Sequence, residues 1–191
     1  MKKLNVLSVL LLVTGSVLAQ TNWSIDKVHS KIGFSVSHMV VSETEGSFKD
    51  YSGTVVSKSD DFNGAEVSFT AKVASINTEN ERRDGHLKSP DFFDAEKFPE
   101  ITFKGTLVKE GNKYKLKGNF TMKGVTKPVE FDVTYGGSID TGRGVKAGFK
   151  LTGTINRQDY GVTWANKLAS GEAVVGDEVQ LTIKVELDKQ A

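Results

Sequence analysis

Apolar and polar residues alternate along most of this 191-residue chain, and this alternation constrains the fold more than any other feature. Residues 113–122 show it best, because Tyr114, Leu116, Phe120 and Met122 share one parity while lysine, asparagine and threonine fill the other. Successive side chains of a strand point to opposite faces of the sheet. The pattern therefore predicts strands with one dry face and one wet face.

The same alternation recurs in about eight segments of the chain. We predict strands near residues 31–38, 46–57, 65–75, 100–108, 113–122, 128–136, 145–155 and 178–188. Tight-turn sequences such as Glu110-Gly111-Asn112 separate several of them. One-faced antiparallel strands either close into a barrel or stack as two sheets, and long strands joined by short hairpins favour the barrel. The sequence therefore predicts an all-β, eight-stranded antiparallel barrel.

Residues 78–98 depart from the alternation and carry helix signals instead. Thr78 followed by Glu81 fits a capping box, and Ser89-Pro90 fits the start of a second helix. We therefore expect a short helical insert at about 78–98. A connection of this length inside a compact domain is often functional, and this insert is placed to cover one mouth of the barrel.

Aromatic and branched aliphatic side chains dominate the predicted inner face. These candidate lining residues are Phe34, Val36, Phe69, Phe103, Phe120, Met122, Phe131 and Phe149. Gly105, Gly118 and Gly153 share the inward parity, and such small residues either leave a channel or mark bends in the strands. An eight-stranded barrel is either filled by its own side chains or holds one small ligand. The alternation leaves both possibilities open.

The sequence carries no familiar catalytic or metal-binding motif. Its three histidines, His29, His38 and His86, lack zinc-site spacing, and the chain has no cysteine. No Gly-x-Ser-x-Gly element is present. We therefore interpret the histidines as rim or surface residues in preference to metal ligands, and we expect neither a metal nor a cofactor.

The densest polar cluster is Arg82-Arg83-Asp84-Gly85-His86. One interpretation is a polar collar for the head group of an amphiphile, because arginine gives bidentate hydrogen bonds to phosphate or carboxylate. The other is that Asp84 anchors the insert to the barrel, and the chemistry alone slightly favours this one. A third hypothesis makes His86 and Asp84 an acid/base pair of an enzyme.

The first residues have the organisation of a secretory signal. Lys2 and Lys3 precede an apolar run over 4–13, and Val17-Leu18-Ala19 supplies small residues for cleavage. We expect a signal peptide at 1–19, one domain at 20–191, and a periplasmic or secreted protein; a retained N-terminal anchor is the alternative. Without these two lysines, 23 basic residues face 24 acidic ones, which argues against nucleic-acid binding. No later segment is apolar enough to span a membrane as a helix.

Four segments, in order along the chain, match the motifs of one known family. They are Asp26-Lys27-Val28-His29-Ser30, Arg83-Asp84-Gly85-His86-Leu87, Gly118-Asn119-Phe120-Thr121-Met122 with the hairpin that follows, and Asn156-Arg157-Gln158-Asp159-Tyr160-Gly161. Together with the alternating background, they make residues 22–188 similar to the YceI-like, polyisoprenoid-binding family.

This resemblance implies a lipocalin-like barrel, usually dimeric, that binds isoprenoid quinones, polyprenyl chains or fatty amides in the periplasm without a known reaction. It adds Trp164 to the apolar lining, and it makes His38, Arg83, Asp84, His86 and Arg157 candidates for a polar mouth. We therefore predict a non-catalytic carrier of a small apolar ligand, and the resemblance implies a homodimer. The alternatives are an enzyme acting on such a lipid, or a packed barrel whose surface binds a protein.

Overall fold

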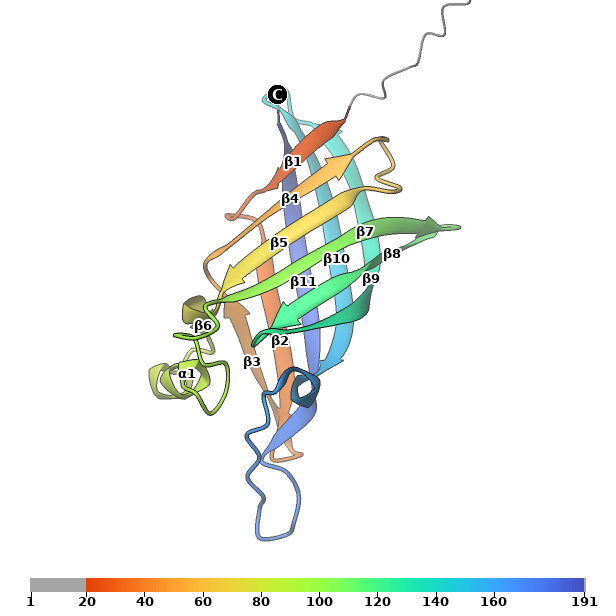
Figure 1. The fold of residues 1–191 in the computed structure, drawn as a ribbon. Helices are drawn as coiled ribbons and strands as arrows, with labels where there is room; N and C mark the ends of the chain where they lie inside the picture. Colours follow the sequence, from red (N-terminus) through yellow and green to blue (C-terminus); the bar gives the residue numbers. More distant parts are fainter. Residues whose placement is uncertain (1–19, 191) are drawn as a thin grey trace, which may run out of the picture.

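Antiparallel strands build almost the whole molecule in the computed structural model, which describes residues 20–190 (Figure 1). The predicted signal peptide lies outside the described residues. The strands are β1 (Thr21–Ile25), β2 (Lys31–His38), β3 (Ser42–Phe48), β4 (Tyr51–Ser57), β5 (Glu66–Lys72), β6 (Ile76–Asn77), β7 (Glu100–Glu110), β8 (Lys113–Met122), β9 (Val125–Asp140), β10 (Val145–Asn156) and β11 (Val175–Lys189). One α-helix, α1 (Glu81–Lys88), and two 3₁₀ turns, η1 (Val73–Ser75) and η2 (Arg157–Tyr160), complete the elements of the described residues.

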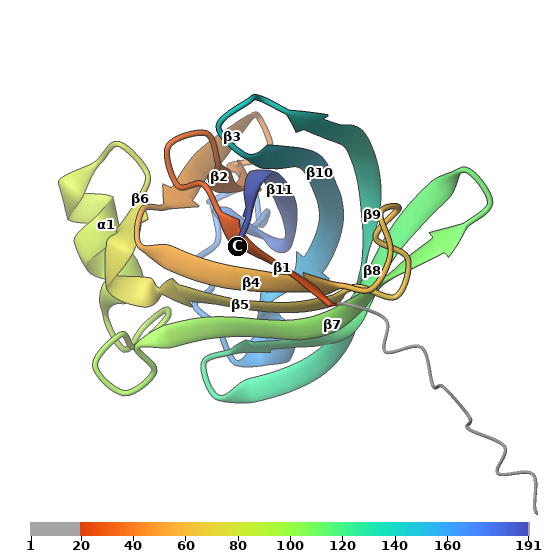
Figure 2. The same cartoon turned by 90° about the horizontal axis from the view of Figure 1, so that it is seen from above.

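The sheet closes on itself because its first and last strands pair. The ring runs β1-β4-β5-β7-β8-β9-β10-β11, and Ile25 of β1 lies opposite Leu187 of β11. Lower on β11, Lys184 pairs with Lys31 of β2, so β1 and β2 share one position in the wall. In the same way β3 and β4 share the next position in the wall, and β5 and β6 share the one after it. The wall therefore has eight strand positions, as predicted, and Figure 2 shows them as a ring around the interior.

The turn between β1 and β2 is fixed by a small set of hydrogen bonds. Ser30 Oγ accepts from the backbone N–H of Glu186 at 3.0 Å, and Tyr51 Oη donates to the carbonyl of Ser30 at 2.9 Å. Asp26 Oδ1 accepts from the N–H of Val28 at 2.9 Å. The Asp-x-x-His-Ser motif therefore holds the place where one wall position breaks into two strands.

The burial of the strands follows the predicted parity. In β8, Tyr114, Leu116, Phe120 and Met122 are buried, and Lys113 and Lys117 on the other face are exposed. The inward glycines make room for aromatic rings: a Cβ on Gly118 would lie 2.7 Å from the ring of Phe103, and one on Gly153 would lie 2.5 Å from the ring of Phe131. Their role is therefore to let these rings lie against the wall.

The helical insert differs in detail from the prediction. The N-cap of α1 is Asn80, whose side chain accepts from Arg83 N at 3.0 Å, and not Thr78. Asparagine is the stronger N-cap, and Thr78 is occupied in a buried contact with Asp84. Ser89 ends α1 in an extended conformation, as expected for a residue before proline, and turns replace the predicted second helix. Within residues 20–190, no helix has the length and apolar character needed to cross a membrane.

Candidate ligand cavity

The barrel is hollow. It surrounds about 1390 Å³ of empty space, including the part that is open to solvent. Nearly all the lining side chains are apolar and come from every wall position and from the insert. Among residues 20–190, Arg157 is the one charged residue in the lining of this cavity. The alternation of the sequence left a packed and a hollow barrel equally open, and the structure has the hollow one.

Most of the predicted lining residues do form the cavity wall. They are Phe34, Val36, Phe69, Phe103, Phe120, Met122 and Phe131. Phe149 and Trp164 do not line it, and the prediction was wrong about their positions. Phe149 has the expected inward parity but lies too near one end of the barrel, where other rings cover it. Trp164 lies at the opposite end, against Phe92 of the insert, with ring centroids 5.1 Å apart.

Five aromatic side chains fill the end of the barrel near the chain termini. We call this set, Trp23, Phe62, Tyr114, Tyr135 and Phe149, the aromatic plug. The ring of Phe62 lies at its centre, 5.0 Å from the rings of both Trp23 and Phe149, and only 1% of this residue is exposed. None of the five lines the cavity. The cavity is therefore closed at this end.

The loop between β4 and β5 holds Phe62 in the aromatic plug. Phe62 has a left-handed backbone with φ of 58°, which is unfavourable for a bulky residue and is maintained by the surrounding contacts. Tyr114 Oη donates to the carbonyl of Asp61 at 2.8 Å, and Lys109 Nζ lies 2.9 Å from Asp61 Oδ2. Hydrogen bonds from Lys109 and Ser59 lower the pKa of Asp61 to about 2. This plug was not predicted, because Phe62 lies in a loop where parity carries no information.

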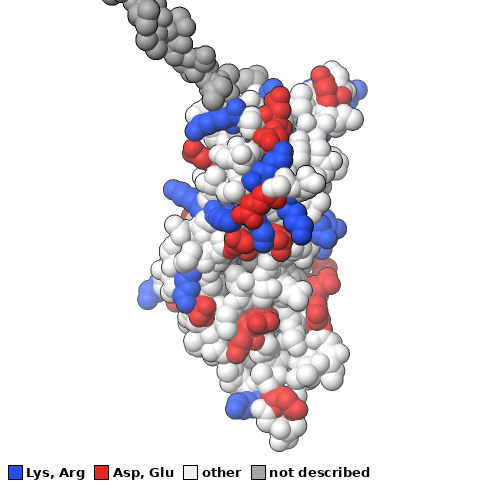
Figure 3. All heavy atoms as spheres, turned by 90° about the vertical axis from the view of Figure 1, so that its right-hand side faces the viewer, with Lys and Arg blue, Asp and Glu red and all other residues white. Residues whose placement is uncertain are grey.

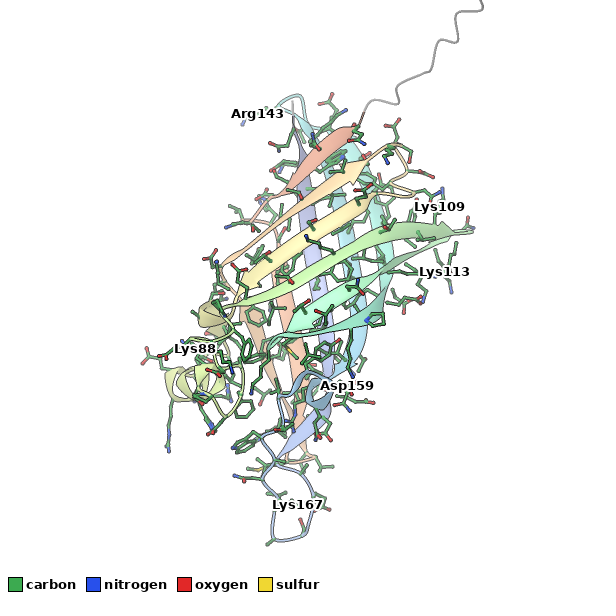
Figure 4. The ribbon with its side chains drawn as sticks, in the orientation of Figure 1. Lys88, Lys109, Lys113, Arg143, Asp159 and Lys167 are labelled. Carbon is green, nitrogen blue, oxygen red and sulfur yellow. The ribbon has the colours of Figure 1, made fainter. Side chains whose placement is uncertain are left out.

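Short helices, turns and coil form the opposite end, which we call the open end. It consists of the insert, η2 and residues 161–174, with Leu87, Phe93 and Val162 facing the cavity. Figure 4 shows Lys167 at this end and Arg143 at the plug end. The insert meets the 161–174 segment through His86, Phe92 and Trp164, whose ring centroids are 4.9 to 5.6 Å apart. No strand pairing joins these two segments within the described chain.

Arg157, a predicted mouth residue, reaches the cavity lining but has no free hydrogen-bond donor. Its Nε and two terminal nitrogens make contacts of 2.7 to 3.3 Å to backbone carbonyls of Gly176, Val162, Trp164 and Val175, and to the carboxylate of Asp177. These five contacts use all five N–H groups of a guanidinium. Burial lowers the pKa of Arg157, and the charge of Asp177 opposes this effect. Arg157 therefore ties the 161–174 segment to the barrel.

Arg83 and Asp84 also anchor a segment. The carboxylate of Asp84, which is buried, accepts from the backbone N–H of Thr78 at 2.9 Å and from its hydroxyl at 2.5 Å. Arg83 Nε donates to the same hydroxyl oxygen at 2.7 Å, and its Nη2 donates to the Thr78 carbonyl at 2.6 Å. The geometry matches the anchoring interpretation of this cluster, and neither residue lines the cavity.

The two predicted histidines lie outside the cavity wall as well. His86 Nε2 lies 3.1 Å from Asp91 Oδ2 and has no hydrogen bond to Asp84, so the acid/base pair of the enzyme hypothesis is not assembled. His38 is half-buried at the end of β2, opposite Val175 of β11. Each of the two adjoins a lining residue, His38 through its pairing with Val175 and His86 through its contact with Phe92.

Asp26, His29 and Glu186 bring their side-chain ligand atoms within 4.8 Å of one another. Lys146 Nζ already lies among the carboxylates, 2.9 Å from Asp26 and 2.7 Å from Glu186. Hydrogen bonds from His29 and Lys146 hold the pKa of Asp26 well below its usual range, and Asp26 raises the pKa of His29. An ammonium group satisfies these carboxylates, so the cluster has the character of a salt-bridge network.

A closed antiparallel barrel of eight strand positions, filled at one end and hollow in the middle, is a lipocalin-like barrel. Residues 23–187 match the model of the YceI-like domain. The chain belongs to the YceI-like family.

Relatives and solved structures agree with this assignment. A UPF0312 protein of Staphylococcus aureus strain N315 is 38% identical over 168 residues, which cover 87% of this chain and 96% of the relative. The crystal structure of the YceI protein of Campylobacter jejuni is 34% identical, with a TM-score of 0.70 over 87% of this chain and 97% of that one. A polyisoprenoid-binding domain from Saccharophagus degradans shares the fold at 15% identity, with a TM-score of 0.66 over 88% of this chain and 98% of that domain.

Proposed function

We propose that this protein binds one long, uncharged apolar molecule in its barrel, such as an isoprenoid or an isoprenoid quinone, and carries it without chemical change. The observation that supports this most directly is the hollow interior with its almost wholly apolar lining. Burying one methylene group contributes about 0.8 kcal/mol, so a chain of about fifteen carbons gains on the order of 10 kcal/mol before ordering costs. Such a ligand needs few polar contacts.

The polar groups around the cavity favour an uncharged ligand. All five N–H groups of Arg157 donate to atoms of the protein itself. Arg157 therefore has no donor left for a carboxylate or phosphate of a ligand. Among the described residues, no buried side-chain nitrogen or oxygen lacks a hydrogen-bond partner. A charged head group inside the cavity would lose its hydration without compensation. The head group of the ligand therefore belongs at the open end, near His86 and Trp164.

The comparisons support the same proposal in outline. The Saccharophagus degradans domain with this fold is described as polyisoprenoid-binding. The absence of a bond between His86 and Asp84 weighs against the enzyme hypothesis. Export through a signal peptide at 1–19, a periplasmic or secreted location, and a homodimer remain proposals that rest on the sequence and on the family resemblance.

Mass spectrometry of an organic extract from natively purified protein tests this function. We expect a stoichiometric isoprenoid, quinone or similar neutral lipid. Phe120→Asp places a charge in the cavity wall and should abolish the bound lipid, while Asn119→Asp adds the same charge to the neighbouring outward position and should leave it unchanged. Circular dichroism establishes that both variants are folded. A lipid-free extract from the native host, or full lipid retention by folded Phe120→Asp, would contradict the proposal.

A further inference from the structure

The turn between β2 and β3 presents three consecutive exposed apolar residues, Met39, Val40 and Val41. We call them the apolar tip. Their exposed fractions are 40%, 67% and 87%, whereas the other large exposed apolar residues in the described chain, Val28 and Ile139, are isolated in sequence. Met39 and Val40 have left-handed backbones, with φ of 52° and 65°. Asparagine or glycine would form such a turn at lower cost, so the apolar side chains do not serve the turn itself.

The apolar tip lies beside the open end of the cavity. Val36 of β2, the strand that leads into the tip, lines the cavity. Val175, which pairs with His38 at the end of β2, lines it as well. The N–H of Met39 donates to the carbonyl of Val174 at 2.9 Å, which joins the tip to the 161–174 segment. In Figure 1 the β2–β3 turn and this segment project together, at the end away from the C-terminus. The aromatic plug closes the other end, so a ligand has to pass near the tip.

The apolar tip and the neighbouring 161–174 segment carry little charge, whereas the insert on the other side of the open end is rich in it. Residues 37–42 contain no lysine, arginine, aspartate or glutamate, and residues 161–174 contain one lysine and one glutamate. Figure 3 shows the side of the molecule that lies on the right in Figure 1. On this side the charged side chains gather over the upper strands, and few lie at the lower end. A partner that meets this surface is therefore held by apolar contact and not by its charge. A lipid bilayer has this chemistry, and it is also where a water-insoluble chain is found.

We propose that the apolar tip inserts into the surface of a lipid bilayer and brings the open end of the cavity against the membrane for ligand exchange. This inference rests on the proposed function, since it assigns the source of the ligand. Because the tip is uncharged, binding should occur on vesicles of phosphatidylcholine alone and should resist high salt.

Vesicle sedimentation tests the contact itself. We expect wild-type protein to sediment with phosphatidylcholine vesicles. The partition coefficient of the double variant Val40→Asn/Val41→Ser should be lower by about tenfold or more. Asparagine suits the left-handed backbone at position 40, so the variant should melt at no lower temperature than wild type. Ile139→Ser and Val28→Ser remove similarly exposed apolar groups elsewhere and should bind as wild type does. Equal binding by wild type and the tip variant would overturn the inference.

Uptake of radiolabelled farnesol from the same vesicles separates this inference from the proposed function. The tip variant should take up farnesol about tenfold more slowly but reach wild-type occupancy when farnesol is supplied in detergent. Phe120→Asp should bind vesicles normally and take up no farnesol. Vesicle binding without farnesol uptake by wild type would contradict the function and leave the docking surface standing. Unchanged farnesol uptake by the tip variant would overturn the docking surface. So would a wild-type dimer that does not bind vesicles and that dissociates when the tip is substituted, because the tip would then be a dimer contact.

Discussion

The two ends of the barrel are built on different principles. At the plug end, five aromatic side chains from separate strands and one loop contact one another inside a closed ring of paired strands. At the open end, the insert and residues 161–174 meet through three rings and are tied to the barrel by Arg157 and by Thr78 with Arg83 and Asp84. From this comparison we expect the plug end to be the more stable one and a ligand to enter at the other.

The largest difference between the ends should come from removing one ring at each. Phe62→Ala empties the centre of the aromatic plug and should lower the free energy of unfolding by about 3–5 kcal/mol. Phe93→Ala removes a partly exposed ring at the open end and should cost less, because the segments there can relax. Urea unfolding of both variants measures the difference. If Phe93→Ala proved the more destabilising, the plug would not be the more stable end.

A second substitution probes how the open end is held. Arg157→Met keeps an unbranched side chain but leaves four backbone carbonyls without their donor, while Asp177 still accepts from Gln158, so we expect a loss of about 2–4 kcal/mol in unfolding free energy. Hydrogen exchange should rise first in residues 161–176 and stay unchanged around Phe62. Uniformly faster exchange over the whole barrel would show that Arg157 stabilises the core and not this segment.

The smallest expected effect concerns pH and the salt-bridge network of Asp26, His29 and Lys146. The lowered pKa of Asp26 means that its contribution to stability is present above the ordinary value of 3.8 and is lost as pH falls below it. The raised pKa of His29 means that its contribution is present below 6.5 and is lost as pH rises through the folded value. Asp26→Asn should therefore lower the free energy of unfolding by an amount on the order of 1 kcal/mol. The loss should be largest between pH 3.8 and pH 6.5, where both contributions are present.

Urea unfolding of wild type and Asp26→Asn at several pH values measures this cost. Asp61→Asn, which interrupts the contact to Lys109 and involves no histidine, is the matched control. Its cost should remain constant on the alkaline side of pH 6.5, where that of Asp26→Asn declines. A pH-independent cost for Asp26→Asn would show that the network contributes through hydrogen-bond geometry and not through charge.

The alternation of the sequence predicted the wall of the barrel well and its two ends poorly. Residues such as Phe103 and Phe120 were placed correctly because strand parity alone decides which way they point. Phe62 and Trp164 lie outside strands, so no period indicates their direction. The contacts of Arg157 reach residues 5 to 20 positions away that only the folded chain brings together. Whether the interior is hollow depends on the summed volume of the side chains, which a pattern of apolar and polar residues does not specify.

The pairing of β1 with β11 also determines when the wall can close. Ile25 and Leu187 stand near opposite ends of the chain, and the described C-terminal residue Gln190 donates to the carbonyl of Asn22 at 2.8 Å. Until β11 has been synthesised, β10 and β1 keep unpaired edges that can join another chain. Contacts of such long sequence separation also slow folding. The barrel can therefore close only after β11 has been made, and any factor that shields the edges of the growing sheet until then would raise the yield of folded protein.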